Sequence, residues 1–271
     1  MGLPAEAGLI WAVTLLTNLY GGIGALVVLV PAESLTVAQL SIMASVMLFA
    51  HAIPTEQAVV RRAGASFVAT SALRVGMALI YGFLSAWLLS GLNLLQEPIP
   101  HSWPIEAGPS LDWIGWFVTV GQTVLLMLIA ITVLNMVVDG LKWLGIVAWM
   151  SRQLTPFMRM TGQNPDLAPI TTTGMLLGLA YGGGLIIQQT QETRLSRRDL
   201  FMSLSCLSLM HAIIEDTLMM LALGANVWVI LVGRALISIA ALWALAQFID
   251  RTEWFVPRET VTIPTDPDKS Q

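Results

Sequence analysis

The sequence predicts an all-α integral membrane protein: an inverted-topology repeat with broken or re-entrant helices and about seven or eight helical membrane segments. Composition, long apolar blocks and an internal repeat lead to this prediction. Of 271 residues, 56% are hydrophobic and 11% are charged, whereas a soluble domain carries about 25% charged residues. The mean hydropathy is +0.75. Several apolar blocks reach the roughly 20 residues that a helix needs to cross a bilayer.

The apolar blocks give the individual elements. They predict membrane helices near residues 8–30, 36–53, 66–90, 112–138, 169–190, 199–222 and 226–249. The stretch 141–160 is apolar at its start but carries Arg152, Pro156 and Arg159 in its second half. It is compatible with an interfacial helix, one arm of a re-entrant hairpin or a further crossing.

Several function classes find no support in the sequence. The single cysteine, Cys206, excludes an internal disulfide framework. A net charge of -4 offers no basic face for nucleic acid. No phosphate loop, nucleophile elbow or zinc-protease motif is present, so we expect neither an enzyme nor a cofactor. Residues 1–7 lack the positive charge of a signal peptide, so we expect the first apolar block to be retained.

The distribution of positive charge orients the chain. The segment 91–111 has no Lys or Arg and is predicted to be a periplasmic loop. The basic residues that should face the cytoplasm are Arg61, Arg62, Arg194, Arg197, Arg198, Arg251, Arg258 and Lys269. All of them fall inside if 141–160 and 169–190 together enter the membrane and return. The C-terminal tail, 250–271, is then cytoplasmic.

An internal repeat links the two halves. His-Ala-Ile occurs at 51–53 and again at 211–213, an offset of 160 residues. At this offset Gly64-Ala65 matches Gly224-Ala225, Arg74 matches Arg234, and Glu56 lies opposite Asp216. One residue out of register, Tyr20-Gly21-Gly22 matches Tyr181-Gly182-Gly183. Matches at polar residues and Tyr-Gly-Gly are harder to obtain by chance than matches between apolar residues.

The loops indicate that the repeat is inverted. The loop 31–36 has no Lys or Arg and is expected outside, whereas its counterpart 193–199 has three arginines and is expected inside. Inverted repeats place solute and ion sites near the membrane midplane. The predicted organisation is repeat 1 at 8–90, the loop 91–111, a linking helix at 112–139, repeat 2 at 140–249 and the tail 250–271.

The two His-Ala-Ile segments carry the candidate chemistry. Pro54 disfavours a continuous helix at Ile53, so His51 and Glu56 flank a predicted helix break. In the second half, His211 and Glu215 stand at i and i+4, which would place them on one helical face. Imidazole and carboxylate together suit a divalent transition metal or a proton relay. The same groups could instead pair with one another for structural reasons.

We therefore predict a solute or ion site and a path beside it. The predicted site residues are His51, Glu56, His211, Glu215, Asp216, Arg74 and Arg234, of which the first five are also candidate metal ligands. The arginines would serve as counter-ions or hold an anionic solute. The predicted path residues are Tyr20, Gly21, Gly22, Tyr181, Gly182 and Gly183, whose glycines also suit helix packing.

The second half resembles a known family. The order of LTPFMRMTG (154–162), YGGGLI (181–186) and HAIIEDT (211–217) resembles the Gate, or nucleoside-recognition, domain. This domain occurs in the membrane part of ferrous-iron transporter B, in spore maturation proteins and in concentrative nucleoside transporters. In the iron transporter a glycine-rich helix precedes a Glu-Asp pair, which Glu215-Asp216 matches. The chain shows neither that transporter's nucleotide motif nor the nucleoside carriers' binding motifs.

The resemblance implies a multi-pass carrier of the bacterial inner membrane, with the lipid bilayer and a small solute or ion as its partners. The solute could be a divalent metal cation. Two alternatives are a proton-coupled carrier of an organic anion or nucleoside-like solute, and a non-transporting assembly or interaction protein. Related folds also associate through their scaffold helices, so 112–138 is the expected surface of a homo-oligomer.

Overall fold

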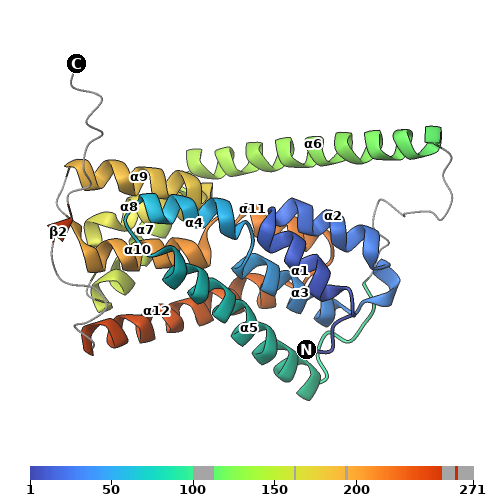
Figure 1. The fold of residues 1–271 in the computed structure, drawn as a ribbon, viewed down its shortest axis with the longest axis horizontal. Coiled ribbons are helices and arrows are strands. Elements are labelled where there is room, and N and C mark those ends of the chain that lie inside the picture. The colour runs from blue at the N-terminus through green and yellow to red at the C-terminus, as the bar shows by residue number, and fades with distance from the viewer. Residues whose placement is uncertain (100–112, 162, 193–194, 252–259, 262–271) are drawn as a thin grey trace. The chain divides into compact units, whose positions relative to one another are not determined.

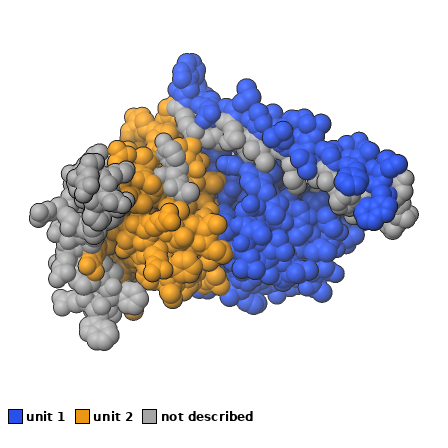
Figure 2. All heavy atoms as spheres, turned by 45° about the horizontal axis from the view of Figure 1, so that its top comes forward, with its two compact units in different colours: residues 1–52, 78–144, 214–232 blue, residues 53–77, 145–213, 233–271 orange. Residues whose placement is uncertain are grey.

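The computed structural model describes residues 1–99, 113–161, 163–192, 195–251 and 260–261. Most of the predicted loop 91–111 and of the tail 250–271 therefore lies outside the described residues. The chain divides into two compact units, coloured in Figure 2. Unit 1 comprises residues 1–52, 78–144 and 214–232, and unit 2 comprises residues 53–77, 145–213 and 233–271.

Unit 1 is built around α3. Its helices are α1 (Ala7–Leu16), α2 (Leu19–Leu29), η1 (Ala32–Ser34), α3 (Val37–Phe49), the second part of α5 (Phe67–Gly91), α6 (Trp113–Trp143), α11 (Glu215–Ala222) and most of η3 (Trp228–Gly233). Helix α3 is buried along nearly its whole length and packs against α1, α2 and α11. Met47 and Leu48 of α3 share one apolar cluster with Leu26 of α2 and Met220 of α11. A helix apolar on all sides is expected at the centre of such a unit.

Unit 2 has α10 in the corresponding role. Its elements are α4 (Ile53–Arg62), the first part of α5, α7 (Ile146–Met160), η2 (Pro165–Leu167), α8 (Ala168–Leu177), α9 (Leu179–Glu192), β1 (Leu195–Ser196), α10 (Arg197–Met210), α12 (Arg234–Arg251) and β2 (Thr260–Val261). The two short strands pair antiparallel. Every residue of α10 from Leu200 to Met210 is buried, and the helix contacts α8, α9 and α12.

Neither unit coincides with one predicted half of the sequence. Helix α4 comes early in the chain but packs against α9 in unit 2, and α11 comes late but packs against α3 and α6 in unit 1. Figure 1 shows this through colour, because blue α4 belongs with the yellow and orange helices of unit 2. Each unit therefore contains residues of both predicted repeats.

The prediction of an all-helical membrane protein is confirmed. In the described part of the chain, four helical stretches are long and apolar enough to cross a membrane: Val37–Arg62, Phe67–Gly91, Arg197–Ala222 and Trp228–Asp250. Three predicted single helices are divided instead: 199–222, which forms α10 and α11, and two others. The block 8–30 forms α1 and α2 because Asn18 caps a new helix, accepting a hydrogen bond from the amide of Gly21 at 2.8 Å. The block 169–190 is interrupted at Gly178, whose φ of 95° only glycine adopts readily.

The ambiguous stretch 141–160 contains the whole of α7. This helix starts after Gly145, which has a φ of 79°, and has 15 residues. A helix of that length rises about 22 Å, which is less than the roughly 30 Å of a hydrocarbon core. Its length therefore favours an interfacial or re-entrant helix over a full crossing.

The same helix caps and helix endings recur 160 residues apart. Thr36 caps α3 by accepting from the amide of Gln39, and Ser196 caps α10 by accepting from the amide of Asp199. Gly64 follows the last residue of α4 by two positions and Gly224 follows that of α11 by two, with φ angles of 97° and 104°. In both cases the next amide, that of an alanine, bonds a carbonyl five residues back, at 3.1 and 3.0 Å. This is the Schellman ending, for which glycine is the preferred residue.

Candidate functional site

The first helix break, in unit 1, positions His51. Helix α3 ends at Phe49, and Ala52 has a φ of 48°, which is unusual for a residue with a side chain. The backbone released there is bound by α1: the amide of Ala52 donates to the carbonyl of Thr14 at 3.0 Å, and the indole of Trp11 donates to the carbonyl of Ala50 at 3.1 Å. The break predicted from Pro54 is therefore present, and it begins a few residues before the proline.

The second break positions His211. Helix α10 ends at Met210, and α11 does not begin until Glu215. Ala212 has a φ of 47°, and the amide of Ile213 donates to the carbonyl of Met175 at 2.9 Å. The expectation that His211 and Glu215 share one helical face is therefore wrong. The chain between them is not helical, and no proline or glycine marks the break.

Both histidines are held in the same way. Nδ1 of His51 lies 3.0 Å from the carbonyl of Met47, and Nδ1 of His211 lies 2.9 Å from the carbonyl of Leu207. A carbonyl only accepts hydrogen bonds, so this network assigns the proton of each ring to Nδ1. The other nitrogen, Nε2, then carries a lone pair, and in each histidine it is the atom nearest to a carboxylate.

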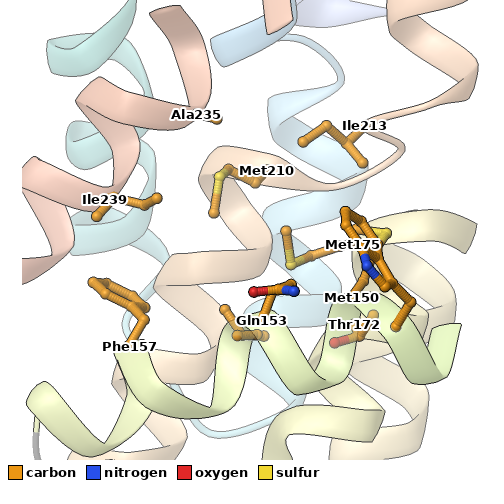
Figure 3. A pocket seen from close by; sticks show the side chains of 11 residues that line it. Met150, Gln153, Phe157, Thr172, Met175, Met210, Ile213, Ala235 and Ile239 are labelled. Atoms are coloured by element: carbon orange, nitrogen blue, oxygen red, sulfur yellow. The ribbon is translucent and has the colours of Figure 1, made fainter. Parts of the chain in front are cut away.

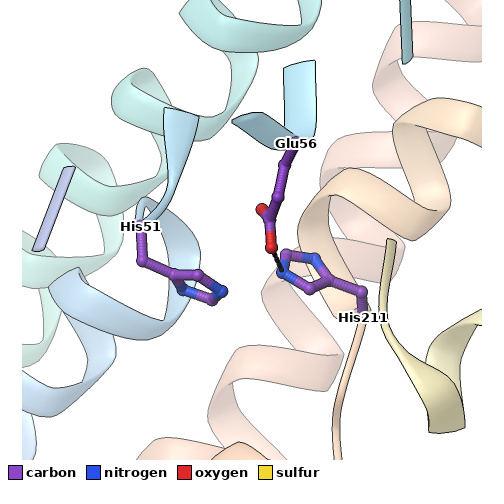
Figure 4. Close-up of side chains that lie close together, drawn as sticks. All are labelled: His51, Glu56 and His211. Atoms are coloured by element: carbon purple, nitrogen blue, oxygen red, sulfur yellow. Dashed lines mark ion pairs between the residues drawn. The ribbon is translucent and has the colours of Figure 1, made fainter. Parts of the chain in front are cut away.

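In unit 2, Nε2 of His211 faces a carboxylate. It lies 3.2 Å from Oε1 of Glu56, and the dashed line in Figure 4 marks this ion pair. The other oxygen of Glu56 lies 2.5 Å from Nη1 of Arg74. The side chains of Arg74 and His211 are 0% and 1% exposed, and that of Glu56 is 17% exposed. The carboxylate thus lies between a buried guanidinium and a buried imidazole.

In unit 1, the second His–carboxylate pair is looser. Nε2 of His51 lies 3.8 Å from Oδ2 of Asp216, with both side chains largely buried. The neighbouring carboxylate, that of Glu215, accepts a hydrogen bond from the hydroxyl of Tyr20. Of the two acidic side chains at the start of α11, Glu215 is bound by Tyr20 of α2, and Asp216 pairs with His51, which follows α3.

The pairing is crossed between the predicted halves. His51 of the first half pairs with Asp216 of the second, and His211 of the second half pairs with Glu56 of the first. At the repeat offset of 160, these two pairs are equivalent. Each unit thus holds one pair, and each pair takes one residue from either half.

Arg234 has a different partner from Arg74. Its Nε and Nη2 donate to the carbonyl of Leu209 at 3.2 and 2.9 Å, and the residue is fully buried. The carbonyls in the last turn of a helix have no partner within the helix. The guanidinium therefore stabilises the end of α10, two residues before His211.

The glycines of the predicted path are packed closely. A β-carbon at Gly22 would lie 1.9 Å from the hydroxyl of Thr14, and one at Gly182 would lie 2.5 Å from the α-carbon of Gly174. Gly21 and Gly183 are similarly close to Thr17 and Val59. These positions exclude any side chain, as a helix contact seam requires. The side chain of Tyr181 lies outside the described residues.

Three contacts near the breaks were not predicted from the sequence. The backbone carbonyl of Thr14 and the indole of Trp11 bind the backbone at the first break, and Gln57 is a fully buried amide whose Oε1 accepts from the hydroxyl of Thr70 at 2.5 Å. A backbone carbonyl leaves no signal in the sequence, and tryptophan is ordinary in membrane helices. Gln57 is adjacent to Glu56, and an amide beside a carboxylate in an apolar chain could have been noticed.

A metal ion would have two ligands available in each unit. His211 and Glu56 provide them in unit 2, and His51 and Asp216 provide them in unit 1. Metal sites in proteins use three or four protein ligands, so neither pair completes a site by itself.

One comparison with known proteins supports a membrane location. The chain is 28% identical over 264 residues to the uncharacterized membrane protein YvoD of Bacillus subtilis (strain 168), covering 91% of this chain and 78% of that protein. No protein-family model matches the chain. No solved structure matches it either.

Proposed function

We propose that this protein is a multi-pass carrier of a bacterial inner membrane, and not an enzyme. It moves a small solute or ion, and its two His–carboxylate pairs hold a cation that moves with the solute or is the solute. The four candidate spans and the similarity to a membrane protein support the membrane location. The pairs support the cation, for the following reason.

The observation that carries the proposal is the orientation of the two histidines. With the proton on Nδ1, a neutral imidazole presents the lone pair of Nε2 to a carboxylate, which is repulsive. At 3.2 Å, the contact of His211 with Glu56 is favourable only with a positive charge between the two atoms. That charge is a proton on one of the partners or a metal cation. A pair that must hold a cation to be stable is suited to bind and release one.

The arginines favour a cation over an organic anion. Arg74 is bound to Glu56, and Arg234 donates to the carbonyl of Leu209. To hold an anionic solute, either guanidinium would have to leave a buried partner. A proton fits the Glu56–His211 pair beside Arg74 most readily, because a divalent ion there would be repelled by the guanidinium. A divalent ion is better suited to a set that includes His51 and the acidic residues Glu215 and Asp216.

We also propose that the two halves form an inverted repeat, with the carrier's site where they meet. The helix caps, the positive φ angles after both histidines and the Schellman endings at the same offset support the duplication. The opposite charge content of the loops 31–36 and 193–199 supports the inversion. We further propose that copies of this protein associate into a homo-oligomer through residues 112–138.

A non-transporting assembly protein is the second candidate. Arg74, Glu56 and His211 already satisfy one another, which is also what a purely structural group would do. The two functions differ in whether the bound cation exchanges with the solution.

The test is a titration of the purified, detergent-solubilised protein with ferrous, manganous and zinc ions by calorimetry, followed by uptake assays in liposomes. His51→Ala and His211→Ala are the test variants. His101→Ala, in the predicted periplasmic loop, is the matched control. We expect His51→Ala to weaken divalent-ion binding at least tenfold, or about 1.4 kcal/mol, His211→Ala to abolish the pH change that accompanies uptake, and His101→Ala to have neither effect. If none of the ions binds and no pH change accompanies uptake of any solute, the carrier proposal is wrong.

A further inference from the structure

Unit 2 contains a cavity that the His–carboxylate pairs do not use. It has a volume of about 200 Å³ and lies between α7, α8, α10 and α12 (Figure 3). Phe157 of α7, Met175 of α8, Met210 of α10 and Ile239 of α12 surround it. All of its lining residues belong to unit 2.

The lining is unsuited to water or a polar solute. Its side chains are aromatic, aliphatic or methionine, except for Gln153 and Thr172. The hydroxyl of Thr172 is buried and has no hydrogen-bond partner among the described residues, so it and Gln153 are the two polar side chains that the lining offers an occupant. A buried water needs two to four polar partners. The cavity therefore favours an apolar occupant.

The walls of the cavity place it at the level of lipid acyl chains. Helices α10 and α12 belong to candidate membrane spans, and Leu236, next to the lining residue Ala235, is 64% exposed. On α7, the lining residues share one helical face, while the exposed Arg152 and Arg159 lie seven residues apart on the opposite face. A helix with arginines on one face and apolar residues on the other lies at a membrane interface.

We propose that the cavity binds one acyl chain of a bilayer phospholipid, whose phosphate lies at the level of Arg152 and Arg159. The arginines then contact the headgroup region while the apolar face of α7 covers the chain. Because Met210 and Ile213 line the cavity on either side of His211, the bound chain packs against the second helix break. The lipid site is independent of whether the protein transports a solute.

The test is photo-crosslinking in liposomes of phosphatidylethanolamine and phosphatidylglycerol that contain a trace of phospholipid with a diazirine on its acyl chain. Met175 and Met210 are only 6% and 3% exposed, so lipid that merely surrounds the protein does not reach them. Leu236 reports this surrounding lipid. We expect adducts on Met175 or Met210 as well as on Leu236, located by mass spectrometry of the peptides.

Ala235→Phe fills the cavity from α12 and is expected to reduce the interior adducts at least fivefold while leaving those at Leu236 unchanged. Ile239→Trp serves the same purpose if the first variant does not remain monodisperse. Thr172→Val should retain the interior adducts, because a hydrocarbon chain needs no hydroxyl. Adducts confined to exposed residues, or interior adducts that survive both filling variants, would overturn the lipid site. Loss of the adducts in Thr172→Val would also overturn it, in favour of a polar occupant.

Discussion

The buried pair of Arg74 and Glu56 allows a sharp test of the candidate site. The guanidinium is 0% exposed, and its Nη1 lies 2.5 Å from the carboxylate. Glu56→Gln removes the charge but keeps the shape of the side chain. Arg74→Met removes the guanidinium and keeps an apolar stem. The third variant carries both changes.

The structure sets the expected magnitudes. Breaking a buried ion pair by removing one partner costs about 3–5 kcal/mol, because the other charge is left in an apolar surrounding. Replacing both partners is often close to neutral. We therefore expect each single variant to be destabilised by about 3–5 kcal/mol and the double variant by clearly less than the sum. If the double variant is no less stable than either single variant, the coupling is about 3 kcal/mol or more, at the upper limit of what contacting residues show.

Thermal unfolding in detergent, at one scan rate, measures these effects. In a protein of this size, about 1 kcal/mol shifts the midpoint by roughly 2–4 °C, so each single variant should lose about 6–20 °C. Asp250→Asn is the matched control, since it breaks the Arg198–Asp250 pair, in which Asp250 is 42% exposed. An exposed pair contributes about 1 kcal/mol or less. Additive single-variant effects, or singles no worse than Asp250→Asn, would refute the reasoning.

Three further predictions concern other parts of the site. Tyr20→Phe removes the hydroxyl that donates to Glu215 and should destabilise the protein by about 1.5–3 kcal/mol; an unchanged midpoint would show that the bond contributes nothing. Ala212→Gly, at a φ of 47°, should change stability by less than about 1 kcal/mol, whereas Ala212→Val should lower it by more; the opposite order would contradict the helix break. In a Cys206→Ser background, cysteine at Glu33 should react with an impermeant maleimide in intact cells, and cysteine at Arg197 only after permeabilisation; labelling of both from one side would exclude the inverted repeat.

The composition of the chain and its few polar residues allowed the membrane class, the first helix break and the residues of the His–carboxylate pairs to be predicted. The membrane class followed from composition, and the first helix break followed from Pro54. The residues of the two His–carboxylate pairs were selected because histidine and acidic residues are costly inside a membrane. The partner of Arg74 also agrees with what the repeat offset suggested.

The second break could not be predicted, for a physical reason. It depends on tertiary contacts around Ala212: the amide of Ile213 donates to the carbonyl of Met175, and the guanidinium of Arg234 donates to the carbonyl of Leu209. Local sequence carries no trace of these bonds, since Ala-Ile-Ile has no residue that disfavours a helix. The breaks inside the single helices expected at 8–30 and 169–190 do have local signals, an asparagine that caps a helix at Asn18 and a glycine at positive φ at Gly178.

The two helix breaks also coincide with the points at which the chain passes from one unit to the other. These points lie between Ala52 and Ile53 and between Ile213 and Ile214. In each case the peptide separates a histidine from the carboxylate that follows it in sequence. The backbone at both points is bound to another helix of its own unit, since the amide of Ala52 donates to the carbonyl of Thr14 and the amide of Ile213 donates to the carbonyl of Met175. An Ala residue at positive φ persists only when surrounding structure holds it, so the two breaks, and with them the positions of both histidines, depend on these contacts with α1 and α8.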